Sequence, residues 1–300
     1  AKLNAAGEIE VGTSYTITNL AEGHSVKTVT IDGSETNAGV YEGKLVPSGA
    51  IIVDKEGNDV TANYEITYVA GDLTITKRGA GEKKVELTAA DNTVEYDGQA
   101  HGAKLNAAGE IEVGTSYTIT NLAEGHRVKT VTIDGSETNA GVYEGKLVPS
   151  GAIIVDKDGN NVTANYEITY VAGDLEIVSP DTVVVTIKGA KDTVEYDGKL
   201  HEVNGYEVVS ISNTLYTAKD FGLAEGATAH AEGTNAGDYY MHLTDESFVN
   251  KNENFASVTF IVEDGKLTIT KRGAGEKKVE LTAADNTVEY DGQAHGAKLN

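Results

Sequence analysis

The 300-residue chain has no cysteine and no tryptophan, one methionine and three prolines. The absence of cysteine excludes disulfides, thiolate metal sites and cysteine nucleophiles. Hydrophobic residues make up 39% of the sequence, so each folded unit can close only a small core. Small cores suit a string of modest domains better than one large enzyme domain, and the length favours roughly two to three domains.

Positive charge and long apolar runs are also scarce. The chain has 24 Lys and Arg residues against 47 Asp and Glu residues, which gives a net charge of −23. A surface this acidic repels phosphate, so we expect no nucleic-acid partner. No apolar run approaches the ~18 residues of a membrane helix, so we expect no membrane insertion in this segment.

Internal repetition is the strongest pattern that the sequence contains. Residues 1–75 match residues 103–177 with four differences at an offset of 102, and residues 77–106 are identical to residues 271–300. A diverged copy occupies about 181–270. Repetition at this period is typical of domain arrays, in which each unit is one folding module.

Three landmarks recur in the same order and define one unit of about 90–100 residues. They are Val-Glu-Tyr-Asp-Gly (94–98, 194–198 and 288–292), Thr-Asn-Ala-Gly-x-Tyr (36–41, 138–143 and 234–239) and a closing Gly-x-Leu-x-Ile (71–75, 173–177 and 265–269). The expected organisation is a partial type A repeat lacking its first strands (1–78), a complete type A repeat (79–179), a type B repeat (180–272) and the first strands of a further type A repeat (273–300).

The incomplete repeats at the two ends leave two explanations open. The sequence is a window cut from a longer periodic polymer, or residues 277–300 complete residues 1–76 of the next molecule by strand exchange. The offsets favour the window, since residues 297–300 repeat residues 1–4.

Alternating apolar and polar residues predict an all-β fold. Val183, Val185 and Ile187 alternate with other residues, as do the tyrosines and isoleucine of 166–170, and Gly-containing turns separate such runs. We expect seven or eight short strands per unit, which is typical of tandem immunoglobulin-like β-sandwich domains in an elongated array. A β-solenoid would need a much shorter period.

The landmarks resemble the MBG and YDG-type immunoglobulin-like repeats of bacterial surface proteins. The strings NVTANYEITYVAGDLEI (161–177) and VEYDGQAHG (94–102) carry the resemblance, which covers essentially the whole chain. It implies tandem arrays, an extracellular location at the bacterial cell surface and a role in adhesion or surface architecture. It implies no catalytic residues.

The stretch Asp-Lys-Asp-Gly-Asn-Asn at 156–161 has the start of a calcium-loop pattern. Such a loop needs oxygen ligands at positions one, three and five and a glutamate at position twelve. Position twelve is Glu167, which lies in an expected strand rather than a helix. A hairpin turn between Val155 and Val162 explains the same residues, so we favour a turn.

Other candidate chemistry is weak. An isopeptide cross-link would need a lysine, an asparagine or aspartate and an acid in an apolar core; Lys44 and Lys146 lie on an expected strand, but His242 occupies about that position in the type B repeat. No serine lies in Gly-x-Ser-x-Gly, and no two histidines have metal-ligand spacing. The histidines are His24, His101, His126, His201, His230, His242 and His295. We therefore expect no enzyme and no catalytic, cofactor-binding or metal-binding residues.

Near-identical copies favour a stalk or shaft, because a shaft needs only stackable units whereas a binding module needs one distinctive surface. The alternative is an adhesive module that binds a host glycan or protein through the type B repeat. That repeat carries aromatic and sulfur-containing residues, most of which we expect to be core or strand positions: Phe221, Tyr239, Tyr240, Met241 and Phe248. Otherwise the expected partners are neighbouring copies of the same chain or of the same long polypeptide.

Overall fold

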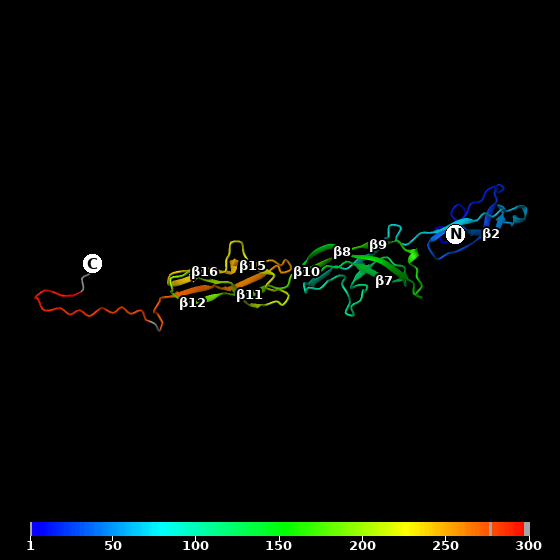
Figure 1. The fold of residues 1–300 in the computed structure, drawn as a ribbon. Helices are drawn as coiled ribbons and strands as arrows, with labels where there is room; N and C mark the ends of the chain where they lie inside the picture. The colour runs from blue at the N-terminus through cyan, green and yellow to red at the C-terminus, as the bar shows by residue number, and fades with distance from the viewer. Residues whose placement is uncertain (1, 276–277, 297–300) are drawn as a thin grey trace. The chain divides into compact units, whose positions relative to one another are not determined.

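The computed structural model describes residues 2–275 and 278–296, and within them the chain is all-β (Figure 1). The expected all-β class is confirmed. The chain divides into two compact units: residues 1–94 with 99–177, and residues 95–98 with 178–300. We name the segments 1–78, 79–179 and 180–272 the first, second and third repeats; their boundaries stay a prediction from the sequence.

The first repeat contains one sheet of three strands in the order β1-β2-β3. Gly43 lies where the register between β2 and β3 shifts, and its φ is +61°, a conformation that glycine adopts without strain. The resulting bulge lets one long strand pair with β3 at its start and with β1 at its end. The elements are β1 (Ser25–Asp32), β2 (Gly39–Val53), the 3-10 helix η1 (Thr61–Asn63) and β3 (Gly71–Ile75).

The second repeat has the same elements and further strands, arranged in two sheets of order β6-β4-β9 and β5-β10-β8-β7. Val85, Leu87 and Ala89 alternate along β4 and are buried, as the period of a strand requires. The elements are β4 (Val85–Ala89), β5 (Asn92–Glu95), β6 (Tyr117–Ile119), β7 (Arg127–Asp134), β8 (Gly141–Val155), η2 (Thr163–Asn165), β9 (Ile168–Val171) and β10 (Gly173–Val178).

The third repeat lies in the other unit and holds four sheets, β14-β11-β19, β12-β20-β17, β13-β16 and β15-β18. The expected strand over 183–187 lies within β11. The elements are β11 (Val183–Gly189), β12 (Lys191–Glu195), β13 (His201–Asn204), β14 (Tyr206–Ile211), β15 (Phe221–Leu223), β16 (His230–Gly233), β17 (Gly237–Tyr240), η3 (Asp245–Ser247), β18 (Phe248–Asn250), β19 (Val258–Glu263) and β20 (Lys266–Thr270).

Aromatic rings dominate the core of this unit. All four phenylalanines of the chain are buried in it: Phe221, Phe248, Phe255 and Phe260. Tyr216 packs edge-on against Phe255, with ring centroids 5.1 Å apart, and Tyr96 does the same from the segment 95–98 at 5.6 Å. Such edge-to-face pairs contribute about 0.5–1.5 kcal/mol beyond the burial of their area.

Tyr216 makes this core sensitive to alkali. Its hydroxyl lies 3.0 Å from the Asp220 carbonyl oxygen and 2.9 Å from Asn250 Oδ1. Burial, and then the charge of Asp220, raise the pKa of Tyr216 to about 12. The folded state therefore holds this proton more tightly than the unfolded chain, whose tyrosines titrate near pH 10.

We predict that the stability contributed by this proton is complete below about pH 10 and is lost as the pH rises towards about 12. Tyr216→Phe should remove this part of the pH dependence and cost about 0.5–1.5 kcal/mol at neutral pH, the usual worth of one hydrogen bond. Urea denaturation at a series of pH values measures both. Parallel pH profiles for the two proteins between pH 9 and 12 would contradict the prediction.

Candidate functional site

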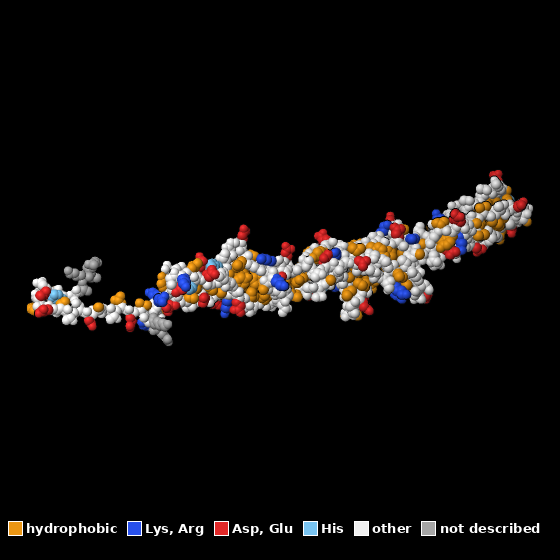
Figure 2. Space-filling view, viewed as in Figure 1, with side chains coloured by type: hydrophobic (Ala, Val, Ile, Leu, Met, Phe, Trp, Pro, Cys, Tyr) orange, Lys and Arg blue, Asp and Glu red, His pale blue; other side chains and the backbone are white. Residues whose placement is uncertain are grey.

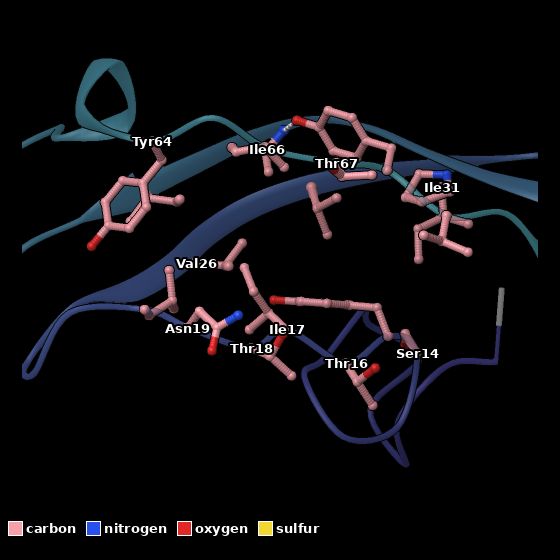
Figure 3. A pocket seen from close by; sticks show the side chains of 18 of the residues that line it. Ser14, Thr16, Ile17, Thr18, Asn19, Val26, Ile31, Tyr64, Ile66 and Thr67 are labelled. Atoms are coloured by element: carbon pink, nitrogen blue, oxygen red, sulfur yellow. Dashed lines mark hydrogen bonds between the residues drawn. The ribbon is translucent and has the colours of Figure 1, made fainter.

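A pocket of about 640 Å³ lies in the first repeat. Residues 14–20 run along one side of it and residues 64–69 along the other, as Figure 3 shows for the labelled part of each segment. Apolar side chains of β1 and β2 also line it, among them Val26, Ile31 and Leu45. The pocket is therefore a groove lined by both polar and apolar residues, with backbone segments on both sides.

The second repeat has the same groove, and there β4 fills it. Residues 116–122 and 166–171 are the counterparts of the two flanking segments, at the offset of 102. β4 pairs antiparallel with β6 on one side, with Leu87 opposite Ile119. It pairs parallel with β9 on the other side, with Leu87 opposite Tyr170. The pocket of the first repeat thus lies at the position that β4 occupies in the second repeat.

Residues of the same type at matching positions of the first and second repeats differ in burial. Eight residues that are buried in the second repeat are only half-buried at the same positions of the first. These pairs are Ser116 and Ser14, Tyr117 and Tyr15, Leu147 and Leu45, Pro149 and Pro47, Val155 and Val53, Tyr166 and Tyr64, Leu175 and Leu73, and Ile177 and Ile75. Because the paired residues have the same type, the change in burial comes from what surrounds them.

The backbone conformation also differs between matching segments of the two repeats. In the second repeat, residues 117–119 form β6 and residues 168–171 form β9. Their counterparts, residues 15–17 and 66–69, form no strand in the part of the chain that the structure describes, although their sequences are the same. A strand ladder needs a partner, so these two segments have the sequence of strands and lack the neighbour that would pair them.

Asn19 shares its backbone conformation with its counterpart in the second repeat. Its counterpart Asn121 has a φ of +59° and donates a hydrogen bond of 2.7 Å from Nδ2 to the carbonyl oxygen of Lys84, next to β4. Asn19 has a φ of +63°, a left-handed conformation that asparagine tolerates better than most residues. The backbone at Asn19 therefore has the same left-handed conformation as at Asn121.

Residues 278–296 carry a further copy of the strand sequence and follow β20 as the red trace of Figure 1. Residues 277–292 are identical to 83–98, the segment that contains β4 and β5. The described residues from 278 onward form no strand. Leu281 is 97% exposed and Tyr290 is 92% exposed, whereas Leu87 in β4 is 0% exposed. The same strand sequence is thus buried in β4 and exposed among residues 278–296.

One possible metal-binding cluster was missed by the sequence analysis. Glu202, His230 and Glu232 have ligand atoms within 4.8 Å of one another, and the two glutamates are exposed. The pairing of β13 with β16 brings them together, since Glu202 lies opposite Glu232. His230 already contacts Asn204 Oδ1 through Nδ1 at 2.7 Å. No local spacing in the sequence could have revealed a cluster formed across two strands.

The calcium-loop candidate is a hairpin turn. Asp156 Oδ1 accepts the backbone N–H groups of Asp158 and Asn160, each at 2.9 Å, and Val155 pairs with Asn161 across the turn. The side-chain hydrogen bond from Asn160, and then its backbone N–H, lower the pKa of Asp156. Asp156 belongs to no group of three potential metal ligands within residues 2–275 and 278–296.

The isopeptide candidates lie in a polar setting. Lys44 forms an ion pair with Glu35 and Lys146 with Glu137, and all four side chains are about one-third exposed. Neither lysine therefore lies in the apolar core that a cross-link would need. Two of the histidines instead contact a tyrosine hydroxyl through Nδ1: His24 with Tyr64 at 2.7 Å, and His126 with Tyr166 at 2.6 Å.

The residues considered for adhesion are mostly core residues. Phe221, Met241 and Phe248 are buried, and Tyr239 is half-buried. Tyr240 is 49% exposed, with Lys266 Nζ 5.9 Å from its ring centroid. A single exposed tyrosine does not form the aromatic platform that sugar or protein recognition would need, so these residues do not favour the adhesive alternative.

Acidic side chains are distributed along the visible face of the molecule, as Figure 2 shows, rather than gathered in one patch. Among the described residues, no helix is long and apolar enough to cross a membrane. Comparisons with protein-family models, with curated proteins and with solved structures found no match to this chain.

Proposed function

We propose that this chain is a structural segment, the stalk or shaft, of an extracellular surface fibre or adhesin of a bacterium. In this proposal its repeats are tandem immunoglobulin-like β-sandwiches of the MBG and YDG type, and it is not an enzyme. Near-identical repeats support the proposal, because a shaft needs only units that stack.

The observation that carries the proposal is the parallel pairing of the first and last strands of a repeat. In the third repeat, β11 runs parallel to β19 over six residue pairs, and β12 runs parallel to β20 over five. Parallel strands start at the same end, so the chain enters at the start of β11 and leaves at the far end of β20. Tension on the chain therefore pulls these strands past each other along their length.

This direction of loading favours resistance to force. When paired strands are sheared, all their ladder hydrogen bonds bear the load together, whereas strands peeled from one end lose their bonds one at a time. The pairing of β11 with β19 has no register shift that would weaken one part of it. The second repeat has the same arrangement, since β4 runs parallel to β9. A stalk must resist tension along the chain, whereas a binding domain that bears no load need not.

Single-molecule pulling tests the proposal, and the absence of native cysteine makes it possible to choose the points of attachment. A chain with Asp181→Cys and Lys271→Cys loads the third repeat in shear. We predict that it unfolds in one event at high force, with a gain in length of roughly 300 Å for about 90 residues. A chain with Asp181→Cys and Ser257→Cys peels β11 from β19 and should open at a clearly lower force.

The comparison of the two chains decides the outcome, because they share the attachment point at residue 181 and differ in whether the second point loads β11 and β19 in shear or peels them apart. Equal unfolding forces would remove the mechanical argument for a stalk. Unfolding of the first chain without a resolvable force peak would remove it as well.

A further inference from the structure

We propose that Glu202, His230 and Glu232 bind one divalent transition-metal ion, zinc in the first place, on the solvent-facing side of the sheet β13-β16 in the third repeat. Figure 1 labels β16, the strand that carries two of the three ligands. The site goes beyond the proposed function and does not depend on it, because a domain can bind a metal ion whether or not it bears load.

The pairing of β13 with β16 places the two glutamates side by side. Glu202 lies directly opposite Glu232, and the neighbouring pair is Val203 with Ala231. Val203 is 8% exposed and Ala231 is 5% exposed, whereas both glutamates are exposed. Because successive side chains of a strand point to opposite faces, the glutamates lie on the solvent face of a sheet whose other face packs into the core. The core therefore holds the backbone that presents the two carboxylates.

His230 belongs to the same face, two residues before Glu232 in β16. Its Nε2 atom lies 3.4 Å from Glu232 Oε2, and the ligand atoms of all three residues lie within 4.8 Å of one another. Two ligands bound about 2.1 Å from a tetrahedral zinc ion are themselves ~3.4 Å apart. The histidine and Glu232 thus have the spacing of two zinc ligands, and the exposed Glu202 can reach the same ion by a change of rotamer.

Asn204 orients the histidine ring. It lies opposite His230 in the register of the two strands, and its Oδ1 atom is 2.7 Å from His230 Nδ1. An amide oxygen can only accept a hydrogen bond, so His230 Nδ1–H is the donor. In the neutral ring the lone pair is then on Nε2, the nitrogen beside Glu232. Metal-binding histidines almost always donate their other N–H group to an oxygen in this way, and Asn204 therefore selects the tautomer that binds a metal.

The charges of the two glutamates also favour a cation. Like charges directly opposite each other on paired strands destabilise a sheet. Among the residues that the structure describes, the lysines and arginines that form ion pairs do so with acids other than Glu202 and Glu232. A protonated His230 would supply one positive charge to the two carboxylates, whereas a divalent ion supplies two. Metal binding would thus turn a repulsive pair into a link between β13 and β16.

The second repeat offers an internal comparison. His101 pairs with Glu137 there, as His201 pairs with Gly233 in the third repeat, and these two pairs align the strands. The positions of Glu202, Asn204, His230 and Glu232 are taken in the second repeat by Gly102, Lys104, Asp134 and Ser136. One carboxylate remains there, with no imidazole and with a lysine in place of the asparagine. The second repeat therefore lacks the ligand set.

The types of the ligands select the ion. An imidazole nitrogen together with carboxylate oxygens suits zinc, whereas calcium and magnesium prefer sites built from oxygen alone. Three protein ligands leave one position of a tetrahedral zinc ion for water or for a further ligand. Because both glutamates are exposed, that position faces solvent.

Calorimetric titration of the full chain with zinc chloride tests the site. We predict that one zinc ion per chain binds more tightly than any ion held by scattered surface acids. Glu202→Gln and His230→Ala should each weaken this binding at least ~10-fold, because loss of an outer partner alone costs about 10–100-fold. The matched controls are Glu225→Gln, an exposed acid, and His201→Ala, whose ring contacts Asp197 instead. Both should bind zinc as the wild type does.

Melting temperatures measured without zinc separate binding from folding. Glu202→Gln should not lower the melting temperature, since it removes one of two opposed charges from an exposed position. Addition of zinc should raise the melting temperature of the unit that contains residues 178–300 in the wild type, and raise it less in this variant.

The role of Asn204 has its own test. Asn204→Ala should weaken zinc binding about 10–100-fold although Asn204 is not a ligand, because Nδ1 loses its acceptor. Nitrogen-15 resonances of labelled histidine provide a readout that a purely structural role would not change. In the zinc-free wild type we predict a proton on His230 Nδ1, and zinc should shift the resonance of Nε2.

Three results would overturn the inference. The first is equal zinc affinity of the wild-type and Glu202→Gln chains. The second is a set of His230 nitrogen resonances that zinc leaves unchanged, since the cluster would then be only an ion pair between a protonated histidine and two acids. The third is displacement of zinc by an equal concentration of calcium, which would show that the histidine is not a ligand.

Discussion

Replacing Leu87 by alanine is expected to lower the free energy of unfolding of the second repeat by about 2–5 kcal/mol. Leu87 is fully buried at the centre of β4, between β6 and β9, and contacts the core residues Tyr117 and Ala152. Its removal would leave a cavity that the surrounding strands can close only in part. Urea denaturation measures the change, with hydrogen exchange of fragments from each repeat separating their transitions.

The chain contains its own control for this substitution. Leu281 lies in the identical sequence Val-Glu-Leu-Thr-Ala and is 97% exposed. Leu281→Ala should leave the stability of both units unchanged, because its side chain is exposed. Equal destabilisation by the two substitutions would contradict the difference in burial between Leu87 and Leu281.

Phe255→Ala is expected to destabilise the other unit by about 3–5 kcal/mol. Phe255 is 1% exposed and makes edge-on contacts with both Tyr96 and Tyr216. The substitution removes the ring on which these two tyrosines pack, so it loses two aromatic pairs as well as buried area. Because the third repeat has a larger aromatic core than the second, the fold should survive with lower stability.

The control for this prediction is Tyr290→Ala. Tyr290 stands at the place of Tyr96 in the last copy of the Tyr-Asp-Gly landmark, and it is 92% exposed. Its removal should change the midpoint of thermal unfolding by at most about 2–4 °C, because surface substitutions usually stay within ±0.5 kcal/mol. A loss of stability from Phe255→Ala no larger than that from Tyr290→Ala would contradict the account of this core.

Patterns local in the sequence predicted much of the fold. The alternation of Val183, Val185 and Ile187 gave a strand with those three side chains buried. Asp156 begins a turn because its carboxylate can accept the N–H groups two and four residues ahead. The landmarks also located the groups of strands, since each repeat closes on the same Gly-x-Leu-x-Ile strand.

Pairing between distant strands could not be read from the same patterns. Residues 66–69 and 168–171 have one sequence, and only the second set forms a strand, because only it has β4 as a neighbour. The cluster around His230 arises from the register of β13 with β16, which no spacing encodes. The strand-exchange explanation stays a prediction from the sequence.

Hydrogen exchange of the two identical segments tests the central claim most directly. Peptides covering 64–75 and 166–177 can be distinguished by mass because they differ at Thr74 and Glu176. In a dilute, monomeric chain we predict protection of 168–171 and rapid exchange of 66–69, since only the former is paired. Equal protection of the two segments would contradict the account.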